Sequence, residues 1–546
     1  PFVPTESSMT RSTVFSAFSD AAARWPDRPV LDVLPETAGI YDIPAGPIPY
    51  ATALATVRER ADALQAAGYR AGQRIMLLLE NRPDFFLYWL AANAAGLSVV
   101  PVNPDLRAAE LEYMIAHAEP ALAIAIPARC AELDAAAWAA GIAMPVVPVG
   151  APFPAAPATL AFDPATEGTA REAAMLYTSG TTGQPKGCVL ANEYFLEAGR
   201  WYANAGGICA LGQDGERMLT PLPIFHMNAM AYSFMAMVTV GGCLIALDRF
   251  HPRSWWASVR DSGATCLHYL GVMPSMLMGA PASPADRDHK VRFGFGAGVD
   301  PALHAAFETR FGFPIMEAWA MTETGAGAVI AANLPPRSVG EACFGRPTDE
   351  IEIRITDDTG ADVAPGQPGE LLVRHAGPDP RRGFFVEYWK NPEETAKVWA
   401  DGWFHTGDVV LQKENGDMVF VDRKKNVIRR SGENIAAVEV ESVLMRHPAI
   451  DAAGVAAVPD AIRGDEVFAC LRVSAPAGPE LAREIAEWAL GQMAYYKVPG
   501  FIAFVDALPL TPTNKIQRAA LKTLAAGLVD APGTADTRSL KKRQMA

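Results

Sequence analysis

Cysteine is scarce in this chain and is never closely paired. The 546 residues contain seven cysteines, an odd number, and no two of them form a CxxC spacing. A disulfide framework needs an even number of cysteines, and a zinc site usually needs closely spaced pairs. The sequence therefore indicates neither, and it predicts a reduced, cytoplasmic protein. The cysteines are Cys130, Cys188, Cys209, Cys243, Cys266, Cys343 and Cys470.

Positive charge is also in deficit. Lys and Arg number 47 against 61 Asp and Glu, so the formal net charge is −14. Phosphate backbones and acidic lipids repel such a body, which argues against nucleic acid or an anionic membrane as a partner. The chain is 50% apolar and 20% charged, a composition that suits a soluble globular enzyme.

No secretory signal is recognisable, and the one long uncharged run does not fit a membrane span. The segment Ala229 to Leu247 is long enough to cross a bilayer. It contains Thr239-Val240-Gly241-Gly242, however, which is typical of a helix end and a turn that leads into a strand. We therefore expect this run to be buried core and expect no integral membrane segment.

Helical and strand patterns alternate through much of the chain. Between Tyr50 and Ile126, short apolar strands follow helical segments with Gly and Pro between them, which is typical of βαβ units on a parallel sheet. The same rhythm from Asp261 to Trp319 predicts a second α/β lobe. Short β segments from Ile351 to Val373 predict a third, β-rich lobe. Mixed strand and helix signals after Val438 predict a small α+β domain.

The predicted fold class is therefore α/β with two domains. A large N-terminal domain, residues 1–422, would contain the two α/β lobes and the β-rich lobe. Residues 423–528 would form the small α+β C-terminal domain. Residues 529–546 are polar and contain Lys541-Lys542-Arg543, so we expect a flexible tail there.

The densest chemical signal is the segment Tyr177 to Gly187, YTSGTTGQPKG, which follows the apolar strand Ala173 to Leu176. Its glycines let backbone N–H groups turn toward an anion, its hydroxyls add donors, and its lysine adds charge, so it predicts a polyphosphate-binding loop. It is not a Walker loop, because Ser or Thr does not follow the lysine. The expected phosphate-binding residues are Thr178, Ser179, Gly180, Thr181, Thr182, Gly183 and Lys186.

This loop resembles the phosphate loop of the adenylate-forming superfamily, which includes acyl-CoA synthetases, nonribosomal adenylation domains and firefly-type luciferases. Further motifs of that superfamily follow in order and cover most of the chain. The stretch Gly432-Glu433-Asn434-Ile435 looks closest to benzoate-type and carnitine-type CoA ligases. The further motifs are Ala318 to Glu323 (AWAMTE), Gly402 to Asp408 (GWFHTGD), Asp422 to Lys425 (DRKK) and Lys515 to Arg518 (KIQR).

The resemblance implies an ATP site with Mg²⁺. Glu323 would hold Mg²⁺ through a carboxylate oxygen, the ligand that a hard cation prefers, and the Thr322 hydroxyl would contact the α-phosphate. Asp408 would accept hydrogen bonds from the ribose hydroxyls, with Arg423 as a second ribose contact.

The adenine would lie between Trp319 and the backbone of Gly296, Ala297 and Gly298. Relatives more often have Tyr-Gly where this chain has Trp319-Ala320. The substitution keeps an aromatic face for stacking but removes any hydrogen bond from a Tyr hydroxyl.

The resemblance also implies a domain that moves about a hinge. Lys515 would stabilise the negative charge of the transition state for adenylation, although Asn514 replaces the usual preceding Gly. Lys425 matches the hinge residue about which the small domain turns between half-reactions. In the second orientation, Gly432 would line a channel for the pantetheine thiol of CoA, where the lack of a side chain leaves room.

His226, in the stretch PLPIFH, matches the residue that gates the passage between acyl pocket and thiol channel in acyl-CoA synthetases; the alternative is a core histidine. Met227 to Met237 and His268 to Met278 are expected to line the acyl pocket. A Met-rich helix is, by pattern alone, more typical of plain core.

The sequence thus predicts an ATP-dependent acyl-CoA synthetase that uses a small-molecule carboxylic acid, which could be aryl, fatty, branched or carnitine-like, together with ATP, Mg²⁺ and CoA. A carrier-protein loader is an alternative, which the lack of an Asp for an α-amino group and of a carrier domain after residue 528 disfavours. A luciferase-like oxygenase is not excluded. A catalytically silent nucleotide-binding protein is disfavoured by Glu323 and Lys515. The identity of the acid and a homodimeric state stay open.

Overall fold

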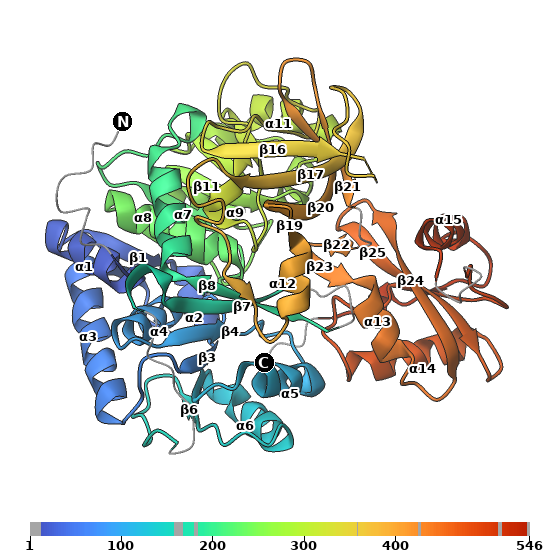
Figure 1. Ribbon diagram of the computed structural model, residues 1–546, viewed down its shortest axis with the longest axis horizontal. Helices are drawn as coiled ribbons and strands as arrows, with labels where there is room; N and C mark the ends of the chain where they lie inside the picture. Colours follow the sequence, from blue (N-terminus) through green and yellow to red (C-terminus); the bar gives the residue numbers. More distant parts are fainter. Residues whose placement is uncertain are drawn as a thin grey trace.

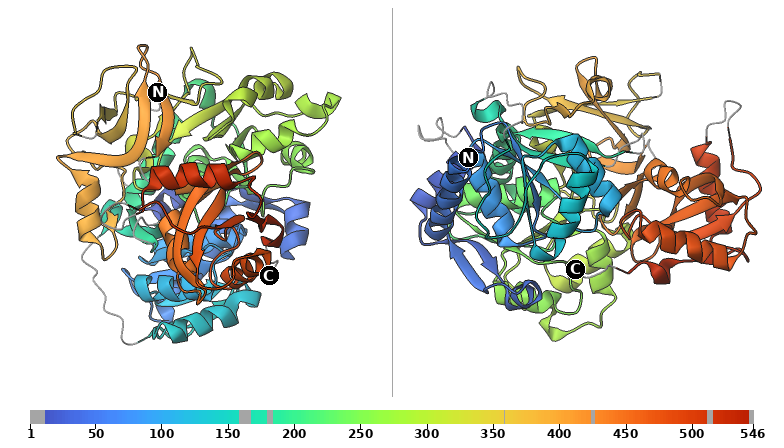
Figure 2. Two further views of the ribbon diagram at one scale, coloured as in Figure 1. Left: turned by 90° about the vertical axis from the view of Figure 1, so that its right-hand side faces the viewer. Right: turned by 90° about the horizontal axis from the view of Figure 1, so that it is seen from below.

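Figure 1 shows the computed structural model of the protein, which describes residues 12–157, 167–178, 184–357, 359–423, 427–510 and 516–542. A small C-terminal part, orange to red, lies beside a large N-terminal part in Figure 1 and in the right-hand view of Figure 2, and in front of it in the left-hand view of Figure 2. The buried apolar clusters divide between the two parts, because those of the large part end at Met418 and those of the small part begin at Ile428.

One sheet of the large part carries the predicted phosphate loop. Its strand order is β18-β8-β7-β4-β3-β5-β6, and the strands from β7 to β6 run parallel. Every residue of β3 is buried, as expected for a strand covered on both faces by helices. The bounds are β3 (Arg74–Leu78), β4 (Ser98–Pro101), β5 (Leu122–Ala125), β6 (Val146–Pro148), β7 (Glu172–Thr178), β8 (Lys186–Ala191) and β18 (Glu387–Tyr388).

The second sheet of the large part has the order β14-β13-β12-β11-β9-β10-β1-β2. Its inner strands are parallel, and the edge strands β14 and β2 are antiparallel to their neighbours. The bounds are β1 (Pro29–Val33), β2 (Gly46–Pro49), β9 (Arg217–Thr220), β10 (Cys243–Ala246), β11 (Cys266–Leu270), β12 (Phe293–Ala297), β13 (Ile315–Trp319) and β14 (Ile330–Ala331).

Helices separate and cover these two sheets. Between the sheets lie α1 (Val14–Arg24), α3 (Tyr50–Ala66), α4 (Pro83–Ala94), α7 (Asn192–Asn204) and α8 (Met235–Val240), whose apolar side chains join both sheets in one cluster. The outer face of the first sheet packs on α5 (Ala108–Ala118) and α6 (Cys130–Ala139). That of the second sheet packs on α9 (Trp255–Ser262), α10 (Val272–Met278) and α11 (Pro301–Phe311). The predicted pair of α/β lobes is confirmed.

The β-rich lobe is also present. Its antiparallel sheet has the order β15-β21-β20-β17-β16, and β19 pairs with β20. Helix α12 (Pro392–Val398) lies beside β18 and β20. The bounds are β15 (Cys343–Gly345), β16 (Ile351–Thr356), β17 (Pro368–His375), β19 (Trp399–Ala400), β20 (Trp403–Gln412) and β21 (Met418–Arg423).

The small part is an α+β domain, as predicted. Its sheet has the order β23-β22-β25-β26-β27, and β24 pairs with β25. Helices α13 (Ala437–Leu444) and α14 (Pro479–Leu490) pack on one face, and α15 (Arg518–Leu528) packs on the other. The bounds are β22 (Val427–Arg430), β23 (Glu433–Ala436), β24 (Ile450–Asp460), β25 (Gly464–Val473), β26 (Phe501–Phe504) and β27 (Ala535–Asp536).

The expectation of a flexible tail over residues 529–546 is wrong for the residues that the structure describes, which end at 542. Strand β27 pairs with β26, and Thr537 donates hydrogen bonds to the carbonyls of Gly500 and Pro499. The Lys541 ammonium lies 2.5 Å from a Glu466 carboxylate oxygen, and both side chains are fully buried. Composition suggested exposure because it could not show that this lysine has a buried partner.

The uncharged run Ala229 to Leu247 is core, as expected. It forms most of a π-helical segment η5 (Asn228–Phe234), then α8, and then β10. Its side chains belong to the clusters between and beside the sheets. Among the residues that the structure describes, no helix combines the length and the apolar composition that crossing a membrane requires.

Candidate active site

The stem of the predicted phosphate loop is an antiparallel hairpin. Strand β7 ends at Thr178 and β8 begins at Lys186, and these two residues are opposite each other in the ladder. The tip of the loop, Ser179, Gly180, Thr181, Thr182 and Gly183, lies outside the described residues. The structure therefore places the two ends of the loop.

Lys186 does not point into solvent. Its ammonium lies 2.5 Å from Oε2 of Glu394, on α12, and 4.6 Å from the ring centroid of Tyr388. Burial alone would raise the pKa of the Glu394 carboxyl, but its contacts with Lys186 and Lys397 hold that pKa below its ordinary value. The motif lysine is thus held by an ion pair at the edge of the loop.

Glu323 lies next to this pair. Its Oε1 accepts a hydrogen bond of 2.8 Å from the Tyr388 hydroxyl and a long one of 3.5 Å from the Thr178 hydroxyl. Burial, and then the charge of Glu323, raise the pKa of Tyr388, so the phenol stays protonated and remains a donor. Thr322 is half-buried beside Glu323. The structure thus places the Thr178 hydroxyl against Glu323, whose neighbour in the chain is Thr322.

Trp319 and Asp408 form a direct contact. The indole Nε1 donates a hydrogen bond of 2.9 Å to Oδ2 of Asp408, which lies on β20 and is 1% exposed. Asp408 is opposite Arg423 in the β20–β21 ladder. The three residues assigned to adenine and ribose are therefore neighbours. The sequence did not reveal that the Trp319 indole donates a hydrogen bond to the Asp408 carboxylate.

The backbone assigned to the adenine follows strand β12. Gly298 has a φ of +80°, and a Cβ on Gly296 would come within 2.2 Å of the Tyr269 carbonyl oxygen, so neither position accommodates a side chain. Ala297 ends the strand between them. All three predicted residues thus form one close-packed turn.

Glu317, which the sequence reasoning missed, holds this turn. Its carboxylate accepts hydrogen bonds from the Gly298 and Val299 amides at 2.8 and 3.0 Å and from the Tyr269 hydroxyl at 3.0 Å. Burial raises the pKa of Glu317, while these donors act in the opposite direction. An acidic residue inside the buried strand β13 was the available signal.

His226 lies where the two parts of the protein meet. Its Nε2 is 3.5 Å from Oε2 of Glu433, which belongs to the small domain. Gly432 has a φ of +91°, and a Cβ there would come within 2.3 Å of the Leu270 side chain at the end of β11. The predicted gate residue and the predicted thiol-channel glycine are therefore close to each other at the boundary between the two parts. Lys425, Asn514 and Lys515 lie outside the described residues.

The segment next to His226 is a π-helix joined to a buried histidine. His268 Nδ1 lies 2.6 Å from Asn228 Oδ1 and 2.9 Å from the Ser233 hydroxyl, and its Nε2 lies 3.0 Å from the Tyr202 hydroxyl. Burial lowers the pKa of His268 to about 3, so the ring is neutral. Both ring nitrogens are engaged, which makes His268 part of the framework of this region. π-Helical turns often occur at functional sites.

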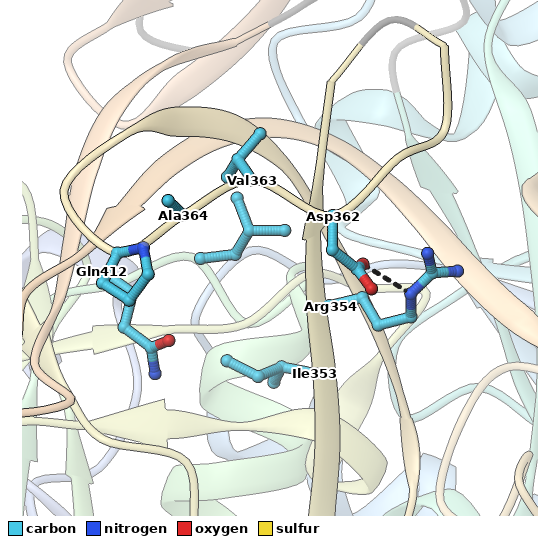
Figure 3. Close-up of a pocket in the computed structure, with 8 residues that line it drawn as sticks. Ile353, Arg354, Asp362, Val363, Ala364 and Gln412 are labelled. Atoms are coloured by element: carbon cyan, nitrogen blue, oxygen red, sulfur yellow. Dashed lines mark hydrogen bonds and ion pairs between the residues drawn. The ribbon is translucent and has the colours of Figure 1, made fainter.

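A separate hollow lies on the β-rich lobe, where Figure 3 shows an ion pair between Arg354 and Asp362 across its rim. It contains none of the predicted site residues, so it is not part of the candidate active site. Its lining residues are Ile353, Arg354, Ile355, Asp362, Val363, Ala364, Pro365 and Gln412.

Comparison with known families agrees with this geometry. The family model described as AMP-binding enzyme matches residues 18–384, and the one described as AMP-binding enzyme C-terminal domain matches residues 439–515. The chain belongs to the AMP-binding enzyme family. A similar curated family member is the crotonobetaine/carnitine–CoA ligase of Salmonella paratyphi A, which is 30% identical over 87% of this chain and 92% of its own length.

Two solved structures of the o-succinylbenzoate CoA synthetase MenE from Bacillus subtilis share the fold. A double mutant bound with the product analogue OSB-NCoA has a TM-score of 0.78 and 23% identity, covering 93% of this chain and 98% of that one. The complex with the acyl-adenylate OSB-AMP has a TM-score of 0.63 and 24% identity, covering 93% and 97%.

Proposed function

We propose that the protein is an ATP-dependent acyl-CoA synthetase. In the first step a carboxylate oxygen attacks the α-phosphorus of ATP, the bond to the bridging oxygen breaks, and pyrophosphate leaves. In the second step the sulfur of CoA attacks the acyl carbon, and the bond to AMP breaks. The observation that supports the proposal is the approach of Gly432 to Leu270 and of Glu433 to His226 at the boundary between the two parts.

In the first step, different residues of the nucleotide site would contact the phosphates and Mg²⁺. The phosphate loop, including Ser179, Gly180, Thr181, Thr182 and Gly183, would bind the phosphates, and Thr322 would contact the α-phosphate. Glu323 offers a single buried carboxylate, which fits Mg²⁺ because that ion is usually held by one or two carboxylates together with substrate phosphates. Bound Mg²⁺ would neutralise phosphate charge. Within the described ranges, no cluster of three or more acidic, His or Cys side chains offers a cage for another metal.

The ribose and adenine would lie beside the ends of strands β12 and β13 of the second sheet and strand β20 of the β-rich lobe. Asp408 would accept hydrogen bonds from the ribose hydroxyls while Trp319 holds its other oxygen, and Arg423 would add a second ribose contact. Gly296, Ala297 and Gly298 would line the base through backbone, which Glu317 fixes.

Lys515 would stabilise charge during adenylation, and Lys425 would be the hinge about which the small domain turns. The arrangement found here suits the second step, because the loop with Gly432 and Glu433 faces His226. A side chain at Gly432 would fill space that the thin pantetheine arm needs. We infer that this is the orientation for thiol transfer.

The substrate is proposed to be a small-molecule carboxylic acid, and a carnitine-like acid is worth testing because the relative described above is a crotonobetaine/carnitine–CoA ligase. The experiment is carboxylate-dependent ATP–pyrophosphate exchange with a panel of betaine-type, aryl and fatty acids, followed by AMP release with and without CoA. Exchange with CoA-dependent AMP release is expected. Exchange that CoA does not stimulate would favour a carrier-protein loader, and nucleotide binding without exchange would favour a silent binding protein.

The role of Lys515 can be tested with one variant. Lys515→Ala should stop exchange but spare thioester formation from supplied acyl-adenylate, because the first orientation alone would bring this lysine to the site. Equal loss of both steps would contradict the assignment of Lys515.

A further inference from the structure

Lys497 sits at the boundary between the two parts of the protein. It follows α14 in the small domain, and its ammonium lies 2.6 Å from Oε1 of Glu439 and 2.6 Å from Oε1 of Glu110. The three side chains are only 7, 8 and 12% exposed, respectively. One buried ammonium is therefore shared by a carboxylate of its own domain, on α13, and a carboxylate of the large domain, on α5.

The contact with Glu110 joins the two parts of the protein, whereas the contact with Glu439 is internal to the small domain. Beside it, the Asn103 side-chain amide donates a hydrogen bond of 3.0 Å to the buried Tyr496 hydroxyl, which is a second polar contact between the parts. A turn of the small domain about a hinge near residue 425 would break both contacts.

Glu110 is also held by a contact within the large domain. It lies in the first turn of α5, where its Oε2 accepts a hydrogen bond of 2.9 Å from the Arg107 amide in a capping box, which leaves Oε1 for Lys497. The same helix supports the phosphate loop, because the Tyr113 hydroxyl donates a hydrogen bond of 2.8 Å to the Pro185 carbonyl oxygen. The docking carboxylate is thus built into the rigid side of the site.

The charges make the contact specific. Without the ammonium, Glu110 and Glu439 would be two buried carboxylates facing each other, and like charges in a poorly solvated place repel strongly. Breaking a buried ion pair by removing one partner is also far more costly than losing an exposed one. Loss of Lys497 should therefore disfavour this arrangement more than loss of Glu110, which still leaves Lys497 paired with Glu439.

We propose that Lys497 is a positioning residue for thioester formation: by pairing with Glu110 it holds the small domain in the orientation in which Gly432 and Glu433 face His226. The proposal rests on the proposed function. It assigns no contact between Lys497 and the reacting atoms; the lysine acts on the second step by placing the loop that does face the site.

The test measures the two half-reactions separately in full-length Lys497→Met, Lys497→Arg and Glu110→Gln. Thioester formation from supplied acyl-adenylate should fall by about tenfold or more in Lys497→Met, while ATP–pyrophosphate exchange stays within about twofold. Lys497→Arg should keep most of the rate, and Glu110→Gln should show a smaller loss of the same step. Arg483→Met removes a charge from a side chain of α14 that is 69% exposed, and it should change neither step.

The pair is tested by combining the variants. Adding Glu110→Gln to Lys497→Met should restore part of the thioester rate, because it removes one of the two repelling carboxylates. Equal loss of both half-reactions in Lys497→Met, or strictly additive losses in the double variant, would overturn the proposal. Since Lys497→Met also unpairs Glu439 and could fail to fold, Glu110→Gln in the other domain supplies the second, independent result.

Small-angle X-ray scattering separates this proposal from the proposed function. Free Lys497→Met should scatter differently from the wild-type chain, because the small domain would leave the arrangement found here, while its thermal unfolding would show that both parts remain folded. An unchanged scattering curve would overturn the positioning role. If the wild-type chain shows no carboxylate-dependent exchange at all, the proposed function fails, and the scattering result still decides whether Lys497 sets the orientation.

Discussion

The indole Nε1 of Trp319 donates a 2.9 Å hydrogen bond to Oδ2 of Asp408, and both side chains are buried. The contact joins the end of β13 to the middle of β20, so it ties the second α/β sheet to the β-rich lobe. It also uses one oxygen of the carboxylate that we assign to the ribose. Trp319, whose ring face we assign to the adenine, thus also holds the Asp408 carboxylate through its indole N–H.

Replacing Trp319 by Phe should weaken ATP binding. The variant keeps an aromatic face, but phenylalanine has no N–H group to replace the indole donor to Asp408. A hydrogen bond to a charged group is typically worth about 1.5–3 kcal/mol. We expect the KM for ATP in pyrophosphate exchange to rise by roughly tenfold. Trp138→Phe is the matched control, because that side chain is 86% exposed. An unchanged KM in Trp319→Phe would mean that Asp408 needs no support from the indole.

Replacing Glu433 by Gln should affect the second half-reaction selectively. The carboxylate lies 3.5 Å from His226 across the boundary between the parts, so it can act on the site only in this arrangement. We expect thioester formation from supplied acyl-adenylate to fall several-fold while exchange is retained. Glu487→Gln, at a side chain that is 52% exposed on α14, should leave both steps unchanged. A matching fall in exchange would show that Glu433 serves the fold in general.

Replacing Glu394 by Ala should destabilise the large domain. The Lys186–Glu394 side chains are 8 and 14% exposed, and removing one partner of a buried pair typically costs about 3–5 kcal/mol. Urea unfolding at neutral pH measures this cost. The reverse case, in which unfolding is unaffected, would indicate that water or the phosphate-loop tip replaces the lost carboxylate.

The same pair gives a pH dependence. Because the folded-state pKa of Glu394 is below its unfolded value, its contribution to stability is complete above about pH 4.5 and is lost as pH falls through the folded pKa. The wild-type chain should therefore lose stability more steeply below about pH 4.5 than Glu394→Gln, measured by urea unfolding across that range. Parallel pH profiles for the two proteins would contradict this.

The helices and strands of the α/β lobes could be predicted from the sequence because their apolar residues recur at regular intervals. The alternation of helices and strands expected between Tyr50 and Ile126 begins with α3 (Tyr50–Ala66) and β3 (Arg74–Leu78). Thr178 was predicted from the residue types of its loop and Glu323 from the resemblance, and the structure brings the two into contact. The periodicity of apolar residues predicts the helices and strands, and the local motifs predict the nucleotide-site residues.

The remaining features depend on contacts between residues far apart in the chain. Glu317 meets Gly298 across two strands, Lys186 meets Glu394 from another lobe, and Lys497 meets Glu110 from another domain. A charged residue in a sequence has no visible partner, so its ordinary interpretation is a solvated surface. The same reasoning made the segment with Lys541 look like a tail.

The C-terminal segment provides the last prediction. Glu466 is fully buried and accepts hydrogen bonds from Arg430 at 2.8 and 2.9 Å as well as from Lys541. Burial, and then the charge of Arg430, lower the pKa of Lys541 to about 7, so the site holds this ammonium at a cost. Removing Lys541 should therefore harm the small domain less than removing Glu466, which would leave two buried cations without an anion.

We expect Glu466→Gln to lower the free energy of unfolding by about 3–5 kcal/mol and Lys541→Met to lower it by less. Between about pH 7 and pH 10 the unfolded chain keeps a proton on Lys541 that the folded chain releases. The contribution of Lys541 to the free energy of unfolding should therefore rise with pH over that window in the wild type, and this rise should be missing in Lys541→Met.

Ending the chain at residue 528 removes β27 and the Thr537 contacts, so it should destabilise the small domain more than either substitution. Thermal unfolding with hydrogen exchange in β25 and β26 measures all three. If the shortened chain unfolds like the wild type, the segment after 528 behaves as the flexible tail that its composition suggested, and the buried position of Lys541 has no energetic consequence.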